Sequence, residues 1–323
     1  MLHDRISARP IRARLEEARQ KGLPTGGRIV PVGGVDTHAV TNPSVPFLSG
    51  GQEVIAVRAD PGGPKPASQT RFCRRDGDGF ALIAGAPALD LEDPFVTTIG
   101  GKLVLGGVRL IWKGGGLDAW VTDIYTGSTI FDLNYLCTGP RHMKDIRLVE
   151  LRDGRIGVFS RPQGQTMLDK HGCIAQIGFA VAERLQDVTA ELIESAPFLQ
   201  GMFLPDEWGG ANQAIVLKNG LVGVIGHSAW GEMIGGVHFL HYYSTAFAID
   251  PNTGRFTEPK VIAARECFEA GPALAERLRD VTFTAGIVRK PNGRAELYTG
   301  LSDMRVGRIE IEDPFLQYEE IKP

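Results

Sequence analysis

Polar residues recur at two fixed distances from five glycines, at positions 51, 101, 154, 220 and 293. Eight or nine residues before these glycines lie Asn42, Asp93, Asp145, Asn212 and, less clearly, Thr284. Seven residues after them lie the polar residues Arg58, Arg161 and His227, with Val108 and Gly300 at the other two positions. Carboxyl groups can donate protons, cationic groups can bind anions and amides can bind hydroxyl groups. The two series together could therefore carry acid catalysis on a polar substrate.

Each of the five glycines lies at the turn of a predicted β-hairpin. A Gly-Gly, Asp-Gly or Asn-Gly pair is followed in every case by a short run rich in apolar residues, which is typical of a turn and a strand. In an antiparallel hairpin, the start of the first strand and the end of the second lie at one edge, away from the turn. Both series of polar residues should therefore meet on one face of the protein.

The five hairpins also indicate the fold class. Successive glycines are 50, 53, 66 and 73 residues apart, which leaves room for about four strands in each repeat. We therefore predict an all-β protein, a five-bladed β-propeller whose first series of polar residues surrounds a central channel. A sandwich or a single barrel would not need five copies of one hairpin, although chance recurrence of common turns is an alternative.

Two segments have helical patterns outside these repeats. Residues 6–21 are rich in helix formers with a rough apolar stripe and end at Gly22-Leu23-Pro24, and residues 272–279 form a second, shorter candidate. We expect a short N-terminal helical extension over residues 1–27. The propeller, which would be the catalytic domain, then covers residues 28–323.

Composition excludes several classes of protein. With 323 residues and 43% apolar side chains, the chain can bury a large core, which excludes a disordered protein or a disulfide-stabilised miniprotein. Lys and Arg total 35 against 38 Asp and Glu, and the isoelectric point is near 6.2. Nucleic acid and anionic membranes are therefore not expected partners.

No segment has the pattern of a signal peptide or of a membrane span, so we expect a cytoplasmic protein. The four cysteines are widely separated and form no CxxC pair, which favours reduced thiols without a disulfide. The histidines show neither HxH nor HExxH spacing. We therefore predict neither a metal site nor a bound cofactor.

Several motifs resemble those of known five-bladed propeller enzymes. Asp90-Leu-Glu-Asp-Pro-Phe resembles the Glu-Asp-Pro signature on the second blade of glycoside hydrolase family 130, the β-mannoside phosphorylases. Further similar segments follow in the order of that family's third to fifth blades: Lys144-Asp, Arg161-Pro-Gln-Gly, Trp208-Gly-Gly-Ala-Asn-Gln, Val224-Ile-Gly-His and Leu297-Tyr-Thr-Gly-Leu-Ser-Asp. The resemblance spans roughly residues 42–311. In detail it is closer to glycosyltransferase family 108, the mannosyltransferase/phosphorylase enzymes of β-1,2-mannan turnover, formerly a domain of unknown function.

This resemblance implies an inverting β-mannoside phosphorylase or mannosyltransferase that acts on β-1,2-mannooligosaccharides. Asp93, the aspartate of Glu-Asp-Pro, would protonate the departing glycosidic oxygen, and inorganic phosphate would be the nucleophile. Phosphate is already an anion, so it needs cationic contacts rather than a second carboxylate acting as base. The phosphate-binding residues carried over are Arg58, Lys144, Arg161 and His227. Those for the mannosyl hydroxyls are Asn42, Asp145, Asn212 and Asp303.

Two positions leave the reaction open. The family commonly has an arginine after Glu-Asp-Pro that helps to hold phosphate, whereas this chain has Phe95. Either phosphate is held by other residues, or a bulkier donor such as a nucleotide-mannose occupies the space, although no nucleotide-binding signature is present. Glu92 could act as the base of a hydrolase, or it could be a structural neighbour that raises the pKa of Asp93.

Two other functions therefore remain as alternatives. A hydrolase of the same fold would release sugar without phosphate and would need Glu92 or Asp145 as a second carboxylate. A non-catalytic carbohydrate-binding propeller would need the blades and the aromatic residues, but it would not need Asp93.

Overall fold

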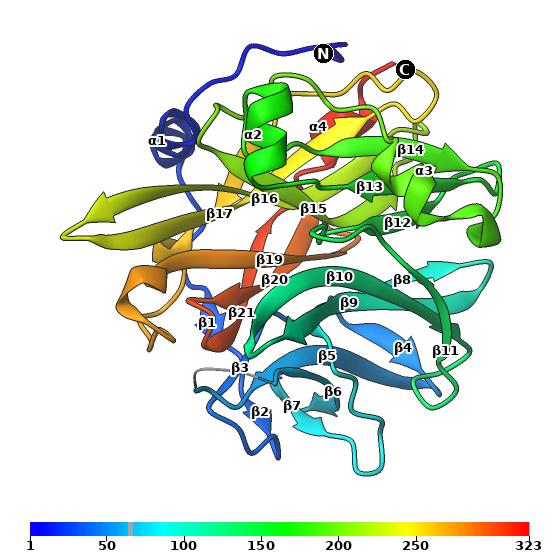
Figure 1. Cartoon of the computed structure of the whole chain (residues 1–323), viewed down its shortest axis with the longest axis vertical. Helices are drawn as coiled ribbons and strands as arrows, with labels where there is room; N and C mark the ends of the chain where they lie inside the picture. The colour runs from blue at the N-terminus through cyan, green and yellow to red at the C-terminus, as the bar shows by residue number, and fades with distance from the viewer. Residues whose placement is uncertain (64–66, 323) are drawn as a thin grey trace.

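The computed structural model describes residues 1–63 and 67–322, and most of the regular structure is β-strand (Figure 1). The strands form four hydrogen-bonded sheets. The first strands of several antiparallel groups, β8, β12 and β15, contact one another at the centre of the molecule. The ends of these central strands are where the sequence places its polar residues.

The first sheet has the strand order β2-β7-β6-β5-β3, and β4 also pairs with β5. Its strands are β2 (Val32–Gly33), β3 (Ala39–Thr41), β4 (Phe47–Ser49), β5 (Gln52–Asp60), β6 (Gln69–Asp76) and β7 (Gly79–Leu82). The second sheet has the order β11-β10-β9-β8. Its strands are β8 (Glu92–Ile99), β9 (Lys102–Lys113), β10 (Gly116–Gly127) and β11 (Asn134–Thr138).

The third sheet contains β12 (Arg147–Glu150), β13 (Ile156–Ser160) and β14 (Gly178–Ala182). The largest sheet contains two antiparallel groups joined by a short parallel pairing between β17 and β19. The first group is β15 (Trp208–Val216), β16 (Val222–Ile234), β17 (Val237–Ile249) and β18 (Lys260–Ala263). The second group is β19 (Asp280–Arg289), β20 (Arg294–Leu301), β21 (Arg305–Glu312) and β1 (Arg28–Ile29). A strand from the start of the chain therefore completes the last group.

All five predicted hairpins are present. They join β4 to β5, β8 to β9, β12 to β13, β15 to β16, and β19 to β20. Each turn glycine has a positive φ, from 72° at Gly101 to 93° at Gly220. This left-handed conformation favours glycine because a β-carbon would clash with the backbone, so glycine at these positions fixes where each hairpin turns.

The helices are few and short: α1 (Ile11–Lys21), α2 (Gln165–His171), α3 (Ala190–Glu194) and α4 (Leu316–Glu319). Helix α1 begins at Ile11, after Pro10, and not at residue 6. The helix expected over residues 272–279 is wrong, because only a 3-10 turn at Glu276–Leu278 forms there. In that segment Leu278 forms a hydrophobic cluster with Val281 and Phe283, and Leu274 packs against this cluster. The Leu274 N–H also donates to the Ser302 carbonyl, so tertiary contacts override helical propensity.

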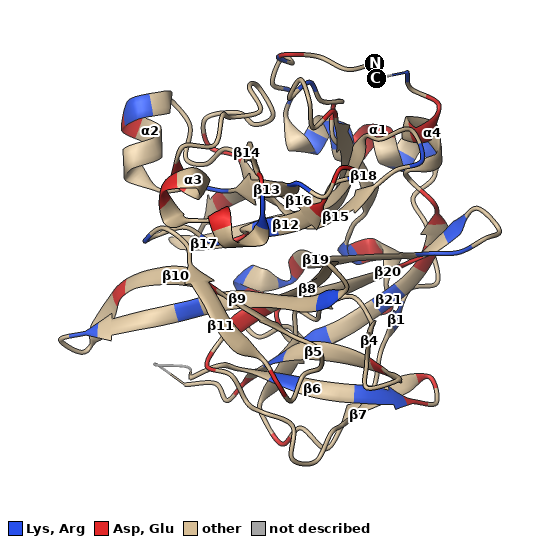
Figure 2. Ribbon diagram, turned by 90° about the vertical axis from the view of Figure 1, so that its right-hand side faces the viewer, with Lys and Arg blue, Asp and Glu red and all other residues tan. Residues whose placement is uncertain are grey.

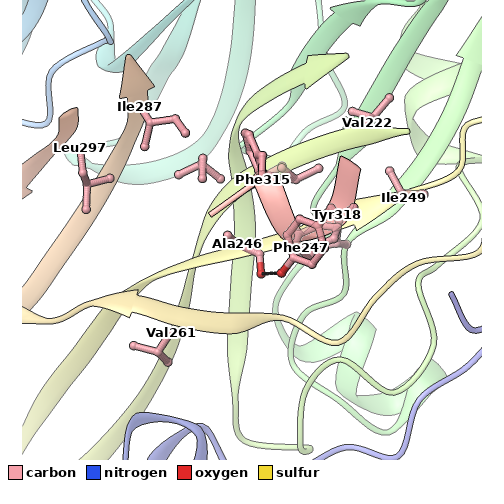
Figure 3. Packing of buried hydrophobic residues seen from close by; sticks show 14 of the residues in the cluster. Val222, Ala246, Phe247, Ile249, Val261, Ile287, Leu297, Phe315 and Tyr318 are labelled. Carbon is pink, nitrogen blue, oxygen red and sulfur yellow. Dashed lines mark hydrogen bonds between the residues drawn. The ribbon is translucent and has the colours of Figure 1, made fainter. Parts of the chain in front are cut away.

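The largest hydrophobic core lies around β16, β17 and the C-terminal helix (Figure 3). Phe247, Phe256 and Phe315 are fully buried there. The Tyr318 hydroxyl donates a 3.0 Å hydrogen bond to the Ala246 carbonyl, which fixes α4 on the strand. Basic and acidic residues are interspersed over the strands, helices and loops (Figure 2). Within residues 1–63 and 67–322, no helix combines the length and apolar character needed to cross a membrane.

Candidate active site

Four of the predicted site residues have a backbone conformation that is rare outside glycine. The φ angles are 44° for Asn42, 49° for Asp93, 57° for Asp145 and 52° for Asp303. Such angles cost energy and persist where the surrounding structure enforces them, frequently at functional sites. The strand irregularity next to Asp93, between Glu92 and Phe95, belongs to the same feature. The fold therefore holds these polar side chains in a fixed direction at the ends of the central strands.

Three of these residues, Asn42, Asp93 and Asp303, line a cavity of about 100 Å³ that has polar and apolar lining residues. The polar wall consists of Asn42, Arg58, Glu92, Asp93, Lys144, Arg161, His227 and Asp303. The apolar wall consists of Leu240, Tyr242, Leu278, Val281 and Phe283. The cavity thus offers both polar groups and apolar surface, and a sugar ring presents both kinds of surface.

Asp93 is 8% exposed and is held from one side only. Its Oδ1 accepts a 2.7 Å hydrogen bond from Asn42 Nδ2 and a 3.4 Å hydrogen bond from Arg58 Nη1. Asn42 Nδ2 also donates to Asp303 Oδ1 at 3.3 Å. Because both contacts use Oδ1, the Oδ2 atom of Asp93 is the oxygen available to carry a proton toward a ligand.

Arg58 is surrounded by carboxylates. Its Nη2 lies 2.9 Å from Asp60 Oδ2 and 3.1 Å from Glu92 Oε1. Burial alone would lower the pKa of Arg58, but the charges of Asp93 and Glu92 outweigh it and raise that pKa. Burial raises the pKa of Glu92, and the nearby Asp93 adds to this effect while Arg58 opposes it. Arg58 is thus a permanent cation beside a carboxyl group that readily holds a proton.

Asp145 and Asn212 were predicted to bind mannosyl hydroxyls, but neither side chain is part of the cavity wall. Asp145 is 1% exposed and accepts hydrogen bonds from Arg161 Nε, at 2.8 Å, and from Arg161 Nη2. Burial would raise the pKa of Asp145, but Arg161 and Arg147 lower it. Asn212 Oδ1 lies 2.8 Å from His227 Nδ1. Asp145 therefore positions Arg161, and Asn212 positions His227. Neither Asp145 nor Asn212 lines the cavity itself.

His227 lies in the cavity wall as an uncharged imidazole. Burial lowers its pKa to about 3. With Nδ1–H donating to Asn212 Oδ1, the Nε2 atom is an acceptor, and it has no hydrogen-bond partner among the residues that the structure describes. The ring stacks on Tyr242 at 5.4 Å between centroids. The Nε2 atom is buried and lies 3.9 Å from Asp145 Oδ2, so His227 contributes the surface of its ring to the cavity and adds no positive charge at neutral pH.

Lys144 and Asp303 complete the polar wall. Burial raises the pKa of Asp303, an effect that Arg58 opposes and Asp93 increases. Across the described parts of the chain, no three His, Cys, Asp or Glu side chains are grouped closely enough to hold a metal ion. The chemistry that this wall offers is therefore proton transfer together with binding of anionic and hydroxyl groups.

Sequence reasoning missed the apolar wall and one buried cation. Leu240, Tyr242 and Phe283 lie in ordinary strand patterns, which gave no signal of a site. Arg147 is 4% exposed, lies 4.4 Å above the Phe95 ring and donates through Nε to the Asn212 carbonyl at 2.9 Å. Phe95 and Arg147 line a second, larger cavity of about 880 Å³ between the central strands, and neither lines the polar cavity.

Comparison with known proteins identifies the family. A family described as protein of unknown function (DUF1861) matches residues 18–317. The chain belongs to the DUF1861 family. A search of curated proteins gives no match for this DUF1861 chain.

Solved structures give closer parallels to this DUF1861 protein. It is 33% identical to MPT-4, a mannose phosphorylase from Leishmania mexicana in complex with a phosphate ion, over 95% of this chain and 94% of that one, with a TM-score of 0.88. It is also 33% identical to MPT-1, a GDP-Man-dependent mannosyltransferase from Leishmania mexicana, over 97% of both chains, with a TM-score of 0.87. A β-1,2-mannobiose phosphorylase from Listeria innocua shares the fold at 15% identity, over 91% of this chain and 93% of that one, with a TM-score of 0.61.

Proposed function

We propose that this DUF1861 protein is an inverting β-mannoside phosphorylase or mannosyltransferase that acts on β-1,2-mannooligosaccharides. The observation that carries the proposal is the placement of Asp93. One of its carboxyl oxygens is fixed by Asn42 and Arg58, and the other is left to donate a proton. The same cavity contains the cations that an anionic nucleophile needs. The 33% identity to a mannose phosphorylase and to a mannosyltransferase supports the choice of mannosyl transfer.

Phosphate would be bound by Arg58, Lys144 and Arg161. The side chains of these three basic residues line the cavity, and Asp145 fixes the direction of the Arg161 side chain. His227 would line the phosphate site as a neutral ring, because burial lowers its pKa to about 3. Phe95 is turned away from this cavity, so phosphate binding does not depend on an arginine at that position.

The reaction would exchange one bond at the anomeric carbon for another. Asp93 gives its proton to the glycosidic oxygen as the bond from that oxygen to the anomeric carbon breaks. A phosphate oxygen attacks the same carbon from the opposite face, so a β-mannoside yields α-mannose 1-phosphate and a shortened acceptor. Asn42 and Asp303 would bind hydroxyl groups of the transferred mannosyl residue. Asp145 and Asn212 would hold Arg161 and His227 in place.

A nucleotide-mannose could replace mannose 1-phosphate as donor in the same cavity, with the diphosphate on the same cations. The sequence identity to a GDP-Man-dependent mannosyltransferase equals that to the mannose phosphorylase, so the comparisons support a nucleotide-mannose donor as well as phosphate.

We also propose that the five antiparallel groups of strands are the five blades of a propeller, the architecture expected for this reaction. The groups begin at β3, β8, β12, β15 and β19, and β1 completes the last of them. We propose residues 28–323 as the five-bladed catalytic domain and residues 1–27 as its N-terminal extension.

The test is an incubation of the protein with β-1,2-mannobiose and phosphate, followed by enzymatic detection of mannose 1-phosphate. We expect formation of mannose 1-phosphate that increases with phosphate concentration and then saturates. A parallel incubation replaces phosphate with GDP-mannose and a mannose acceptor. Sugar release at equal rate without phosphate would instead indicate a hydrolase. Binding of the disaccharide with no turnover under any of these conditions would favour a carbohydrate-binding propeller.

A further inference from the structure

The cavity is small compared with the substrates proposed for it. Its volume of about 100 Å³ is below the roughly 300–1,000 Å³ that ligand sites usually have. An oligosaccharide that places its terminal residue beside Asp93 must therefore extend outside the cavity. The question is which surface the next sugar residue contacts.

The hairpin of β16 and β17 carries one wall of the cavity outward. The two strands pair without interruption from Val222 with Ile249 to Ile234 with Val237, and the far end of the hairpin projects from the body of the molecule (Figure 1). Leu240 and Tyr242 of β17 line the cavity. Since residues two apart on a strand face the same side, His238 continues this face beyond the cavity.

Gly231 shapes this continuation. It pairs with Leu240 across the hairpin, so a β-carbon on Gly231 would point to the same face as Leu240. Such a β-carbon would lie 2.1 Å from Nε2 of His238, which means that the imidazole lies across the bare backbone of Gly231. The exposed His238 ring and Leu240 thus form a continuous surface, which we call the outer strip.

The opposite face of the hairpin is already occupied. Trp230 stacks on His241 with 4.1 Å between ring centroids, and the guanidinium of Arg12 lies 4.7 Å from the Trp230 ring. His241 Nδ1 also contacts Asp280 Oδ2 at 2.7 Å. A ligand that extends from the cavity along this hairpin therefore meets the outer strip, because side-chain contacts already cover the other face of the hairpin.

We propose that the outer strip is a binding site for the second sugar residue of the substrate. The apolar face of that sugar ring would pack against Leu240, and one of its hydroxyl groups would hydrogen-bond to the His238 imidazole. This assignment rests on the proposed function, since it names where the acceptor side of a β-1,2-mannooligosaccharide is held. His238 would be a specificity residue that takes no part in bond cleavage.

The test measures phosphorolysis of β-1,2-mannotriose by the wild type and by His238→Ala, with KM determined separately for oligosaccharide and phosphate. Loss of one hydrogen bond and a ring contact should raise the KM for mannotriose about threefold to tenfold. The KM for phosphate should stay within about twofold, and His238→Gln should recover part of the loss. The matched control is Val237→Ala, an exposed neighbour on the opposite face, which should change neither constant. An unchanged KM for mannotriose in His238→Ala, or an equal rise in both constants, would overturn the proposal.

A second measurement separates this proposal from the proposed function. Calorimetric titration with β-1,2-mannotriose in the absence of phosphate needs no turnover, and His238→Ala should bind about threefold to tenfold more weakly than wild type. If the wild type makes no mannose 1-phosphate, the proposed function fails. Equal affinities of wild type and His238→Ala for mannotriose would show that the outer strip does not bind the second sugar residue.

Discussion

The chemistry of the cavity depends on which of its titratable residues are charged. Arg58 remains a cation because the nearby Asp93 and Glu92 outweigh the effect of its burial. Burial raises the pKa values of Glu92 and Asp303, so these carboxyl groups are more easily protonated than usual, and it makes His227 neutral. Protonation of either carboxyl group would reduce the negative charge that balances Arg58, Lys144 and Arg161, and this would favour a phosphate anion.

The neutral state of His227 predicts a pH dependence of stability. Its pKa falls from 6.5 to about 3 on folding, so the unfolded chain binds the proton more readily than the folded protein. The stability that depends on the neutral ring is present above pH 6.5 and is lost as the pH falls toward 3. Between pH 6.5 and 5 the free energy of unfolding should fall by about 1.5 kcal/mol more for wild type than for His227→Gln.

Urea denaturation of both proteins at several pH values measures this difference. His3→Gln is the control for a histidine substitution outside the cavity, because His3 lies in the N-terminal segment, where it pairs with Phe256. Parallel profiles of wild type and His227→Gln would show that folding does not change the pKa of His227.

Individual site residues differed in how far the sequence could predict them. Regular spacing from the turn glycines indicated Asn42, Asp93, Arg58 and Arg161, because that spacing fixes the edge of a hairpin on which a residue lies. It does not fix side-chain contacts, so Asp145 was expected at the ligand and instead lies behind Arg161. The neutral state of His227 could not be predicted from the sequence either, because it arises from burial by residues that are distant in sequence.

Among the secondary-structure elements, the central strands position the site through local irregularities. The left-handed conformations of Asn42 and Asp93 direct their side chains to a common point, and neighbouring strands must leave room for them. Gly300 on β20 leaves such room for Asn42. A β-carbon at Gly300 would lie 1.8 Å from Asn42 Oδ1 and 2.8 Å from the Asn42 backbone nitrogen.

Gly300→Ala should therefore displace Asn42 and weaken its hold on Asp93. We expect a loss of stability of about 1–3 kcal/mol, as for other overpacked sites, together with a lower kcat for phosphorolysis. Thermal unfolding and the mannose 1-phosphate assay measure the two effects. Gly116→Ala on β10 is the control, because a β-carbon there meets no atom within 4 Å. Full activity of Gly300→Ala would show that Asn42 does not position the acid.

The hairpins were predictable because glycine is required at their turns, whereas the segment at residues 272–279 was not. Its helix formers suggested a helix, but Leu274 and Leu278 belong to a hydrophobic cluster with Phe283, and Leu278 lines the cavity. Apolar residues that build a ligand wall have the same sequence pattern as apolar residues of a core. The wall formed by Tyr242 and Phe283 could not be distinguished from core packing for this reason.

At the scale of the whole molecule, the start of the chain holds the fold together. Strand β1 pairs with β21 near the C-terminus, and helix α1 packs against β18 and β16. Ile11 and Leu15 of α1 are buried in the largest core, and the Ile11 N–H donates to Glu207 Oε1 at 2.7 Å. The N-terminal extension is therefore a packed part of the structure.

Leu15→Ala should destabilise the protein by about 2–5 kcal/mol, because it leaves a cavity under α1. The change should leave the KM for phosphate unaffected, since Leu15 does not line the polar cavity. Chemical denaturation gives the stability, with the exposed Glu16→Ala as control. Equal stability of the two variants would mean that α1 adds little to the core.

The central claim is that Asp93 is the general acid of a phosphorolysis, and Asp93→Asn tests it most directly. Asparagine tolerates the left-handed φ of 49° at this position, so the backbone should be retained. We predict a fall in kcat of about 10²–10⁴-fold on β-1,2-mannobiose with phosphate. The variant should keep most of its activity on 2,4-dinitrophenyl β-mannoside, whose leaving group needs no proton. An Asp93→Asn variant that cleaves both substrates at the wild-type rate would contradict the account.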